Sequence, residues 1–245
     1  MHTVIYGPPG TGKTEIAKMM GKIYSKLGIL SKGTFKKVTR GDLVAGYLGQ
    51  TALKTKDVIK EAIGGVLFID EAYALGNSEK RDSFAKECID TLCEALSDNK
   101  DDLMVIIAGY ENELKECFFD YNQGLDSRFT WRFKTDEYNP EDLYKILIKK
   151  VKDIGWEIDD KSITSEWFRK NKDYFKFFGR DIETILAKTK IAHGRRVFCK
   201  LENEKRKINL KDLDNGFKTY LNNEDVKNRK NNIQFKKELY NTLYS

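Results

Sequence analysis

The sequence predicts an α/β fold: a parallel sheet flanked by helices, followed by a small all-α domain. Two observations lead to this prediction. As far as about Glu137, short apolar runs alternate with stretches of helical periodicity, which is typical of a parallel sheet with helices on both faces. From Asn139 onward the pattern is helical, and no further run predicts a strand. We therefore expect domains at residues 1–137 and 138–245, the second ending in a polar, basic tail.

The expected elements follow in order from these patterns. In the first domain, apolar runs predict strands at 2–6, 35–39, 66–69, 104–108 and 130–133. Helical periodicity predicts helices at 14–27, 52–63 and 83–96. The dipeptide Asn139-Pro140 then marks a turn and a helix start, since proline suits the first helical turn. Behind it we expect helices at 143–151, 165–171, 180–192 and 210–221.

The segment that follows the first strand, residues 7–14, has the sequence GPPGTGKT, which is typical of a phosphate-binding loop and is called the phosphate loop below. Its glycines let backbone N–H groups converge on an anion, and the helix beginning near Lys13 adds its positive dipole end. Lys13 can reach the β- and γ-phosphates, and the Thr14 hydroxyl can bind magnesium. An ordinary turn is the alternative interpretation. The candidate nucleotide ligands here are Gly7, Pro8, Pro9, Gly10, Thr11, Gly12, Lys13, Thr14 and Glu15.

Two acids, Asp70 and Glu71, end the apolar run at 66–69, which lies between Gly64-Gly65 and a helical stretch. Such a run predicts a buried parallel strand, and acids at its carboxyl end face the crevice where α/β sheets bind ligands. Asp70 can hold magnesium through water, and Glu71 can orient or deprotonate a water molecule. The alternative is an acid cluster that complements a helix dipole.

Composition limits the class of protein. Forty per cent of the 245 residues are hydrophobic, which is enough for a sizeable core, and no run approaches the roughly 20 apolar residues of a membrane span. The four cysteines show no zinc-ligand spacing, so we expect them to be reduced and buried in a cytoplasmic protein.

The predicted second domain is basic. From Asn139 onward there are 25 Lys and Arg against 17 Asp and Glu. A solvated helical surface explains this excess better than a nucleic-acid site, which is not excluded.

Several motifs together resemble those of AAA+ ATPases. The phosphate loop is paired with LFIDEAY at 67–73, and RGDLVAGYLGQTALKT at 40–55 lies between them. The last segment, IAGY at 107–110 and NQGLDSRF at 122–129 are similar to the branch that holds the red-type Rubisco activase CbbX and stage V sporulation protein K. The resemblance is strong to about Phe133 and weaker beyond Phe177.

The resemblance implies a site for ATP and Mg²⁺. Lys13 and Thr14 would bind phosphate and the metal, Asp70 would support the metal, and Glu71 would activate water. Tyr110 stands where many AAA+ proteins carry a polar residue after the fourth strand. Magnesium ligands would thus be Thr14 and Asp70, and the catalytic residues would include Lys13 and Glu71.

The same resemblance implies a ring. Arg128 would be the arginine finger that enters a neighbouring subunit's site, and Arg180 would reach the nucleotide from the helical lid domain. Tyr47, Leu48 and Gly49 would form a pore loop that grips a polypeptide. The alternatives are a surface ion pair for Arg128, a helix-start pair for Arg180-Asp181 and a core aromatic for Tyr47. Two departures from the family are the sequence Phe177-Phe178-Gly179 and the few residues ahead of the phosphate loop, where the family has a further helical segment.

The resulting hypothesis is a Mg²⁺-dependent ATPase that remodels a protein client as a homo-oligomer, expected to be a ring hexamer. A nucleic-acid motor or loader of the same class is the first alternative, and it predicts stimulation by DNA that falls steeply with salt. A nucleotide-dependent module that does not hydrolyse ATP is the second alternative. A small-molecule kinase is more distant, because no acceptor-site motif is present.

Overall fold

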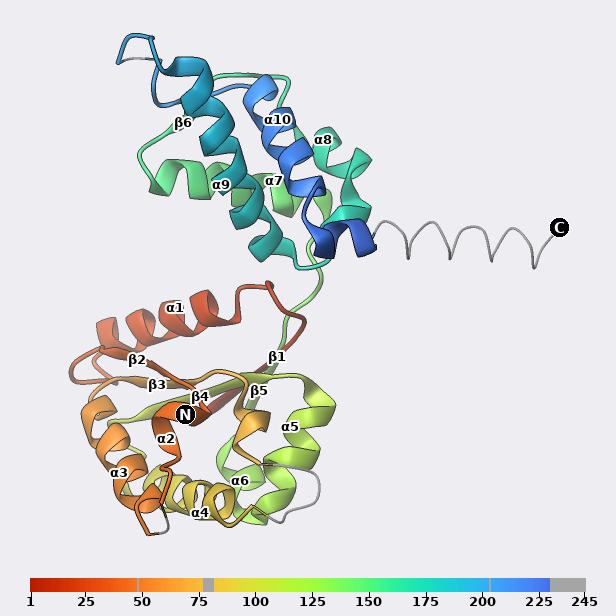
Figure 1. Cartoon of the computed structure of the whole chain (residues 1–245). Helices are drawn as coiled ribbons and strands as arrows, with labels where there is room; N and C mark the ends of the chain where they lie inside the picture. The colour runs from red at the N-terminus through yellow and green to blue at the C-terminus, as the bar shows by residue number, and fades with distance from the viewer. Residues whose placement is uncertain (48, 77–81, 203, 230–245) are drawn as a thin grey trace, which may run out of the picture. The chain divides into compact units, whose positions relative to one another are not determined.

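The computed structural model describes residues 1–47, 49–76, 82–202 and 204–229 (Figure 1). Leu48 of the predicted pore loop and residues 230–245 of the predicted tail lie outside the described residues. The chain divides into two compact units. Residues 1–8 and 12–136 form the first, and residues 9–11 together with the chain from Glu137 onward form the second.

The first unit is built on a parallel five-stranded sheet, as predicted. Its strand order is β2-β3-β4-β1-β5, so the first strand in the sequence lies between the last two. Both faces are covered, which is why the inner strands consist of continuous apolar residues. The strands are β1 (Thr3–Tyr6), β2 (Phe35–Val38), β3 (Val66–Ile69), β4 (Met104–Gly109) and β5 (Trp131–Lys134).

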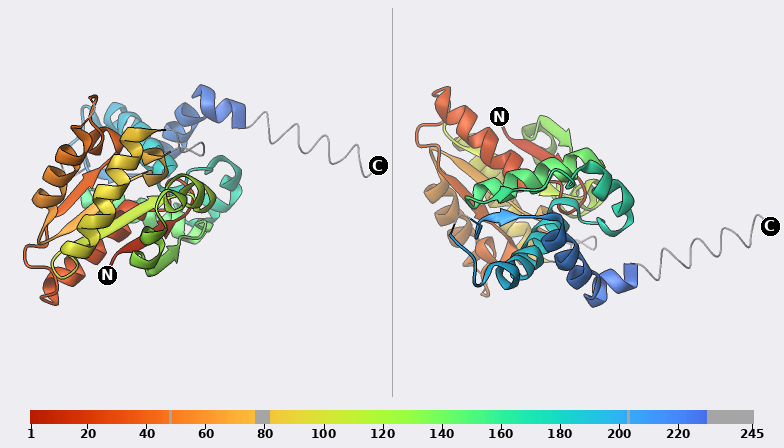
Figure 2. Two further views of the ribbon diagram at one scale, coloured as in Figure 1. Left: turned by 90° about the horizontal axis from the view of Figure 1, so that it is seen from below. Right: turned by 90° about the horizontal axis from the view of Figure 1, so that it is seen from above.

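Helices cover the two faces of this sheet. Helix α1 (Lys13–Lys26) lies over one face, and α3 (Thr51–Ala62) and α4 (Ser83–Asp98) pack side by side over the other (Figures 1 and 2). Alternate residues of each strand enter the two cores: Val66 and Phe68 lie in the cluster with α1, whereas Leu67 and Ile69 lie in the opposite one. Shorter helical segments are α2 (Arg40–Leu43), η1 (Ala72–Leu75), α5 (Glu111–Cys117), η2 (Phe119–Tyr121) and α6 (Gln123–Arg128).

The second unit packs helices around its own core. Helix α7 (Pro140–Asp153) begins as predicted, with Pro140 in its first turn and a capping box between Asn139 and Asp142. Its apolar face packs against α9 (Phe178–Val197) and α8 (Ser165–Lys170), and α10 (Leu210–Leu221) crosses α9 closely. The short segment η3 (Lys172–Tyr174) lies between α8 and α9.

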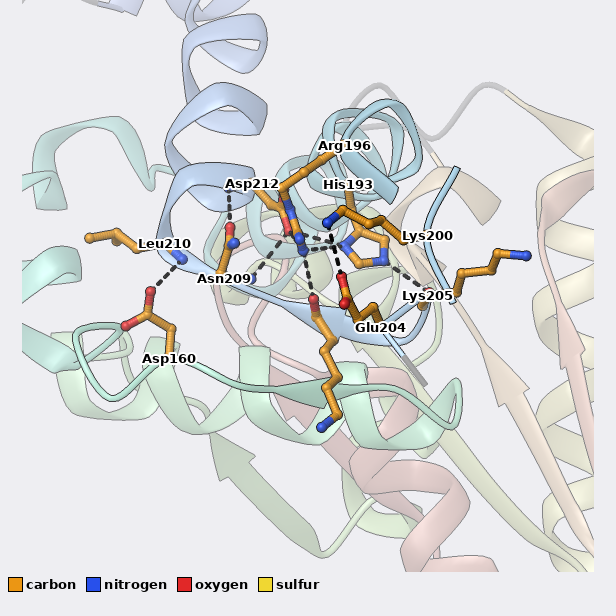
Figure 3. Close-up of polar contacts among 10 residues, drawn as sticks. Asp160, His193, Arg196, Lys200, Glu204, Lys205, Asn209, Leu210 and Asp212 are labelled. Atoms are coloured by element: carbon orange, nitrogen blue, oxygen red, sulfur yellow. Dashed lines mark hydrogen bonds and ion pairs between the residues drawn. The ribbon is translucent and has the colours of Figure 1, made fainter. Parts of the chain in front are cut away.

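A buried polar cluster joins the end of α9 to the start of α10 (Figure 3). Asp212 is 1% exposed and accepts hydrogen bonds from Arg196 Nε at 2.8 Å and Nη2 at 2.8 Å. His193 Nδ1 lies 3.0 Å from the same carboxylate, and His193 Nε2 lies 2.9 Å from the Lys205 carbonyl. Burial opposes ionisation of Asp212, but the bonds from Arg196 and His193 outweigh it and hold the pKa of Asp212 below its ordinary value.

Two expectations need correction. The helical region also contains two-residue strands, β6 (Glu157–Ile158) and β7 (Lys207–Ile208), which pair in parallel. Two residues are too short to show a period-two pattern in the sequence. The cysteines were all expected to be buried, but only Cys88 and Cys93 are; Cys117 is half-buried and Cys199, in the turn after α9, is exposed. In the described part of the chain, the helices are too short or too polar to cross a bilayer.

Candidate functional site

Three neighbouring strands of the first unit end at one edge of the sheet, and a predicted site residue follows each of them. Gly7 follows β1, Asp70 follows β3 and Tyr110 follows β4. Because β3, β4 and β1 are adjacent and parallel, their carboxyl ends lie together, and the Gly7 N–H donates to the Gly109 carbonyl at 3.3 Å. A Cβ at Gly7 would lie 1.8 Å from Thr135 Oγ1, so only glycine fits there.

The phosphate loop leads into helix α1 through Gly12, whose φ of 81° lies in the left-handed region. Lys13, Thr14 and Glu15 then form the first helical turn, at the positive end of the helix dipole. The Lys13 ammonium donates to the carbonyls of Gly7 at 2.8 Å and Pro8 at 2.9 Å. A fixed positive charge and the amino end of a helix therefore meet at one loop, which is the arrangement that binds phosphate. Glu15 pairs with Lys18 at 2.8 Å.

Asp70 lies half-buried at the end of β3, and its carboxylate forms an ion pair with Lys37 Nζ at 2.6 Å. Lys37 comes from β2, the neighbouring strand, and the sequence analysis did not identify it as a site residue. The available signal was its position one residue before the end of an edge strand. The donor set also suits magnesium, because the Thr14 hydroxyl and the Asp70 carboxylate both offer hard oxygen atoms.

Glu71 is exposed and has an unusual backbone. Its φ of 52° and ψ of 46° place it in the left-handed region, which costs a non-glycine residue about 1–2 kcal/mol. Asp70 extends the strand, whereas Glu71 caps the short helix η1 that follows it. Backbone strain of this kind is found preferentially at functional sites, and here it lies directly after a central strand of the sheet.

A pair of tyrosines lies at the same edge. Tyr110 is 39% exposed, and its ring centroid lies 5.9 Å from that of Tyr73, in η1. Burial, and then the charge of Glu71, raises the pKa of the Tyr73 hydroxyl. At neutral pH this edge therefore presents a protonated phenol close to the two acids.

Arg128 ends helix α6 and is half-buried. Its Nε donates to Ser97 Oγ at 2.8 Å, and its Nη1 donates to the Gly124 carbonyl at 2.7 Å. Both of these acceptors are neutral oxygen atoms of the first unit, rather than the carboxylate expected of a surface ion pair. These bonds hold the side chain beside the end of α4.

Tyr47 is 74% exposed, so it is not a core aromatic of the first unit. Gly46 has open space around it, and Gly49 has a φ of 77°. A large aromatic side chain thus stands on a loop that glycines on both sides shape.

Arg180 lies in the first turn of α9 in the second unit, where its side chain is exposed. The next residue, Asp181, is 3% exposed. The predicted approach of Arg180 to the nucleotide stays a prediction.

Comparison with known proteins identifies the family. Residues 3–133, more than half of the chain, match the ATPase family associated with various cellular activities (AAA). The chain belongs to this family. The fold of this AAA protein agrees with that of the FIGL-1 AAA domain in complex with ADP, with a TM-score of 0.64 over 97% of this chain and 77% of that one. At 20% identity this likeness shows the fold alone.

Relatives place the AAA protein in the predicted branch. It is 43% identical to the putative cfxQ-like protein R730 of Acanthamoeba polyphaga mimivirus over 96% of this chain and 59% of that protein. It is 36% identical to stage V sporulation protein K of Bacillus subtilis over 80% of this chain and 57% of that protein. It is 37% identical to CbbX of Cereibacter sphaeroides over 81% of this chain and 65% of that protein. The predicted resemblance is confirmed, and the match spans only 57–65% of the length of these relatives.

Proposed function

We propose that this chain is the Mg²⁺-dependent ATP-hydrolysing part of a protein-remodelling machine. One observation carries the proposal: the Lys13 loop follows β1 and the acids Asp70 and Glu71 follow β3, the two strands that flank β4 in the parallel AAA sheet, and Glu71 has a strained backbone conformation. Phosphoryl transfer needs positioning and charge neutralisation more than covalent help, and this edge offers both.

Each residue has a proposed part in the reaction. Lys13 binds the β- and γ-phosphates, and Thr14 and Asp70 hold Mg²⁺, which neutralises phosphate charge when it is bound. Glu71 orients the attacking water and accepts its proton. Arg128 of a neighbouring subunit stabilises the charge that develops on the transferred phosphoryl group. Tyr110 lies at the edge of the sheet where Glu71 would hold the attacking water.

The proposed partners are a protein client and further copies of the same chain in a ring hexamer. The exposed Tyr47 supports a peptide-gripping loop, because an aromatic face offers sequence-tolerant contact with a passing chain. Arg180 of the proposed lid domain, residues 138–245, would contact the nucleotide bound by its own subunit.

The test compares Glu71→Gln with the native protein. We expect Glu71→Gln to bind a fluorescent ATP analogue normally but to hydrolyse ATP at least about 100-fold more slowly, because an amide cannot take the proton from water. Glu116→Gln, an exposed acid of α5, is the matched control and should hydrolyse ATP at the native rate. Hydrolysis by Glu71→Gln at the native rate would refute the assignment. Binding without turnover in the native protein would favour a non-hydrolysing module, and strong stimulation by DNA would favour a nucleic-acid motor.

A further inference from the structure

Arg229, beyond helix α10, is a largely buried residue that contacts several elements of the second unit. Its side chain is only 14% exposed, and its Nη1 lies 3.1 Å from both carboxylate oxygens of Asp181. The same nitrogen lies 3.2 Å from the Tyr174 carbonyl and 3.1 Å from the Tyr220 hydroxyl. Its guanidinium carbon lies 4.6 Å from the centre of the Phe177 ring. One side chain thus contacts α9, α10 and the segment that precedes α9.

These contacts converge on the turn that carries Arg180. Asp181 directly follows Arg180 and accepts the N–H of Phe177 at 2.7 Å, which closes the turn from 177 to 181. Phe178, inside this turn, has a φ of 40°, a conformation that a bulky residue adopts only when its surroundings enforce it. The bonded Asp181 carboxylate is one such constraint, and Arg229 neutralises that carboxylate.

Residues of the phosphate loop touch the same turn within the second unit. The Gly179 N–H donates to the Gly10 carbonyl at 3.0 Å. A Cβ at Gly10 would lie 1.9 Å from the Phe177 carbonyl oxygen, so the approach is too close for any other residue. The turn that Arg229 holds is therefore in direct contact with Gly10, a candidate nucleotide ligand.

We infer that Arg229 is a positioning residue for nucleotide binding: its pair with Asp181 fixes the strained turn and thereby sets the direction of Arg180. The inference rests on the proposed role of Arg180 at the nucleotide. It assigns a function to the segment after α10, which no motif of the sequence analysis covered. Arginine suits this place because its planar group can stack on Phe177 while it bonds several oxygens, whereas lysine offers only a compact charge.

The test measures the dissociation constant of a fluorescent ADP analogue. We expect Arg229→Ala to raise it about tenfold, because a misdirected Arg180 would lose a hydrogen-bonded contact to a charged phosphate, and Arg229→Lys to raise it less. In an Arg180→Ala background, Arg229→Ala should have no additional effect, because the group it positions is gone. Thermal unfolding of each variant shows whether the second unit is folded under the conditions of the measurement.

The chain offers a matched control for loss of a buried pair. Arg196→Ala removes another pair between an arginine and a buried aspartate of the second unit, that of Arg196 in α9 with Asp212 in α10 (Figure 3). We expect it to lower the melting temperature as Arg229→Ala does while leaving the dissociation constant unchanged. If Arg229→Ala fails to fold, Arg229→Lys and its combination with Arg180→Ala give the same comparison.

The possible failures can be told apart. If Arg180→Ala leaves the dissociation constant unchanged, the proposed role of Arg180 is wrong and the inference falls with it. If Arg180→Ala weakens binding and Arg229→Ala does not, only the inference is overturned. Equal weakening by Arg196→Ala, or additive losses in the double variant, would also overturn it, because both would indicate general destabilisation.

Discussion

The ion pair between Lys37 and Asp70 sets a competition at the proposed metal site. The ammonium lies 2.6 Å from the carboxylate that would support Mg²⁺, so the two cations would share one anionic partner. An ammonium held at this distance neutralises the carboxylate and weakens its attraction for a second cation. Lys37 therefore opposes binding of the metal by Asp70.

We predict that Lys37→Met tightens Mg²⁺ binding to the nucleotide complex several-fold, by about 1 kcal/mol. Titration calorimetry of Mg²⁺ into the ADP-bound protein measures this. Lys36→Met is the matched control: it is the preceding residue of the same strand, and its partner is Glu61, an exposed acid of α3. Equal affinities for the native protein and Lys37→Met would mean that Asp70 does not support the metal.

A second prediction about a single residue concerns Tyr47. Its side chain is 74% exposed, so truncation removes no core contact and should leave the melting temperature within about 1 °C. We expect Tyr47→Ala to keep basal hydrolysis and lose stimulation by a polypeptide such as unfolded casein, and Tyr47→Phe to be mild, because the ring face makes the contact. Measuring hydrolysis with and without that polypeptide checks it. Preserved stimulation in Tyr47→Ala would remove the pore-loop assignment.

At the scale of elements, α9 and α10 cross with their backbones in close approach. A Cβ at Gly216 would lie 2.6 Å from the Thr189 Cα and 2.6 Å from its backbone nitrogen. Backbone atoms cannot move aside as a flexible side chain can, so the two helices require a glycine at this point. The packing of the second unit depends on this approach.

We therefore predict that Gly216→Ala lowers the free energy of unfolding of the second unit by about 1–3 kcal/mol, the usual cost of overpacking. Gly194→Ala is the matched control, because Gly194 is inside α9 with open space around it. It should instead stabilise the helix by about 0.5–1 kcal/mol. Urea unfolding followed by circular dichroism measures both changes. A neutral Gly216→Ala would show that the crossing can widen without cost.

The sequence predicts long elements well and their contacts poorly. Runs such as 66–69 identify buried strands because both faces of a parallel sheet are covered, and the capping box at Asn139 marks the start of α7. Helices α2, α5 and α6 are too short to show a period of 3.6 residues. The pair between Lys37 and Asp70 depends on β2 lying next to β3, and neither strand order nor the φ of Glu71 follows from local pattern.

At the scale of the whole molecule, a shared active site is the central consequence of the proposal. Arg128 is tied to Ser97 and Gly124 in its own unit, so it would have to act on a neighbouring copy from the end of α6. Two variants that are inactive alone can then complement each other. In a mixed ring, some interfaces combine an intact Lys13 with an intact Arg128.

We predict that Arg128→Ala and Lys13→Ala proteins, each inactive alone, recover part of the native hydrolysis rate when mixed. An arginine finger acting in trans contributes on the order of 10³–10⁵ in rate, so even a small share of intact interfaces is measurable. The control is a double variant that carries both changes in every subunit. It should stay inactive, because none of its interfaces has both residues intact. A mixture no more active than its components would argue against a shared site.

The place of β1 in the sheet has a consequence for synthesis on the ribosome. This strand is the first of the sheet in the sequence, yet its two neighbours are β4 and β5, which end 103 and 128 residues after its own end at Tyr6. Until residue 134 has left the exit tunnel, the N–H and C=O groups along one side of β1 have no strand to pair with. A nascent chain thus carries its phosphate loop on an unpaired apolar strand, the kind of surface that chaperones bind.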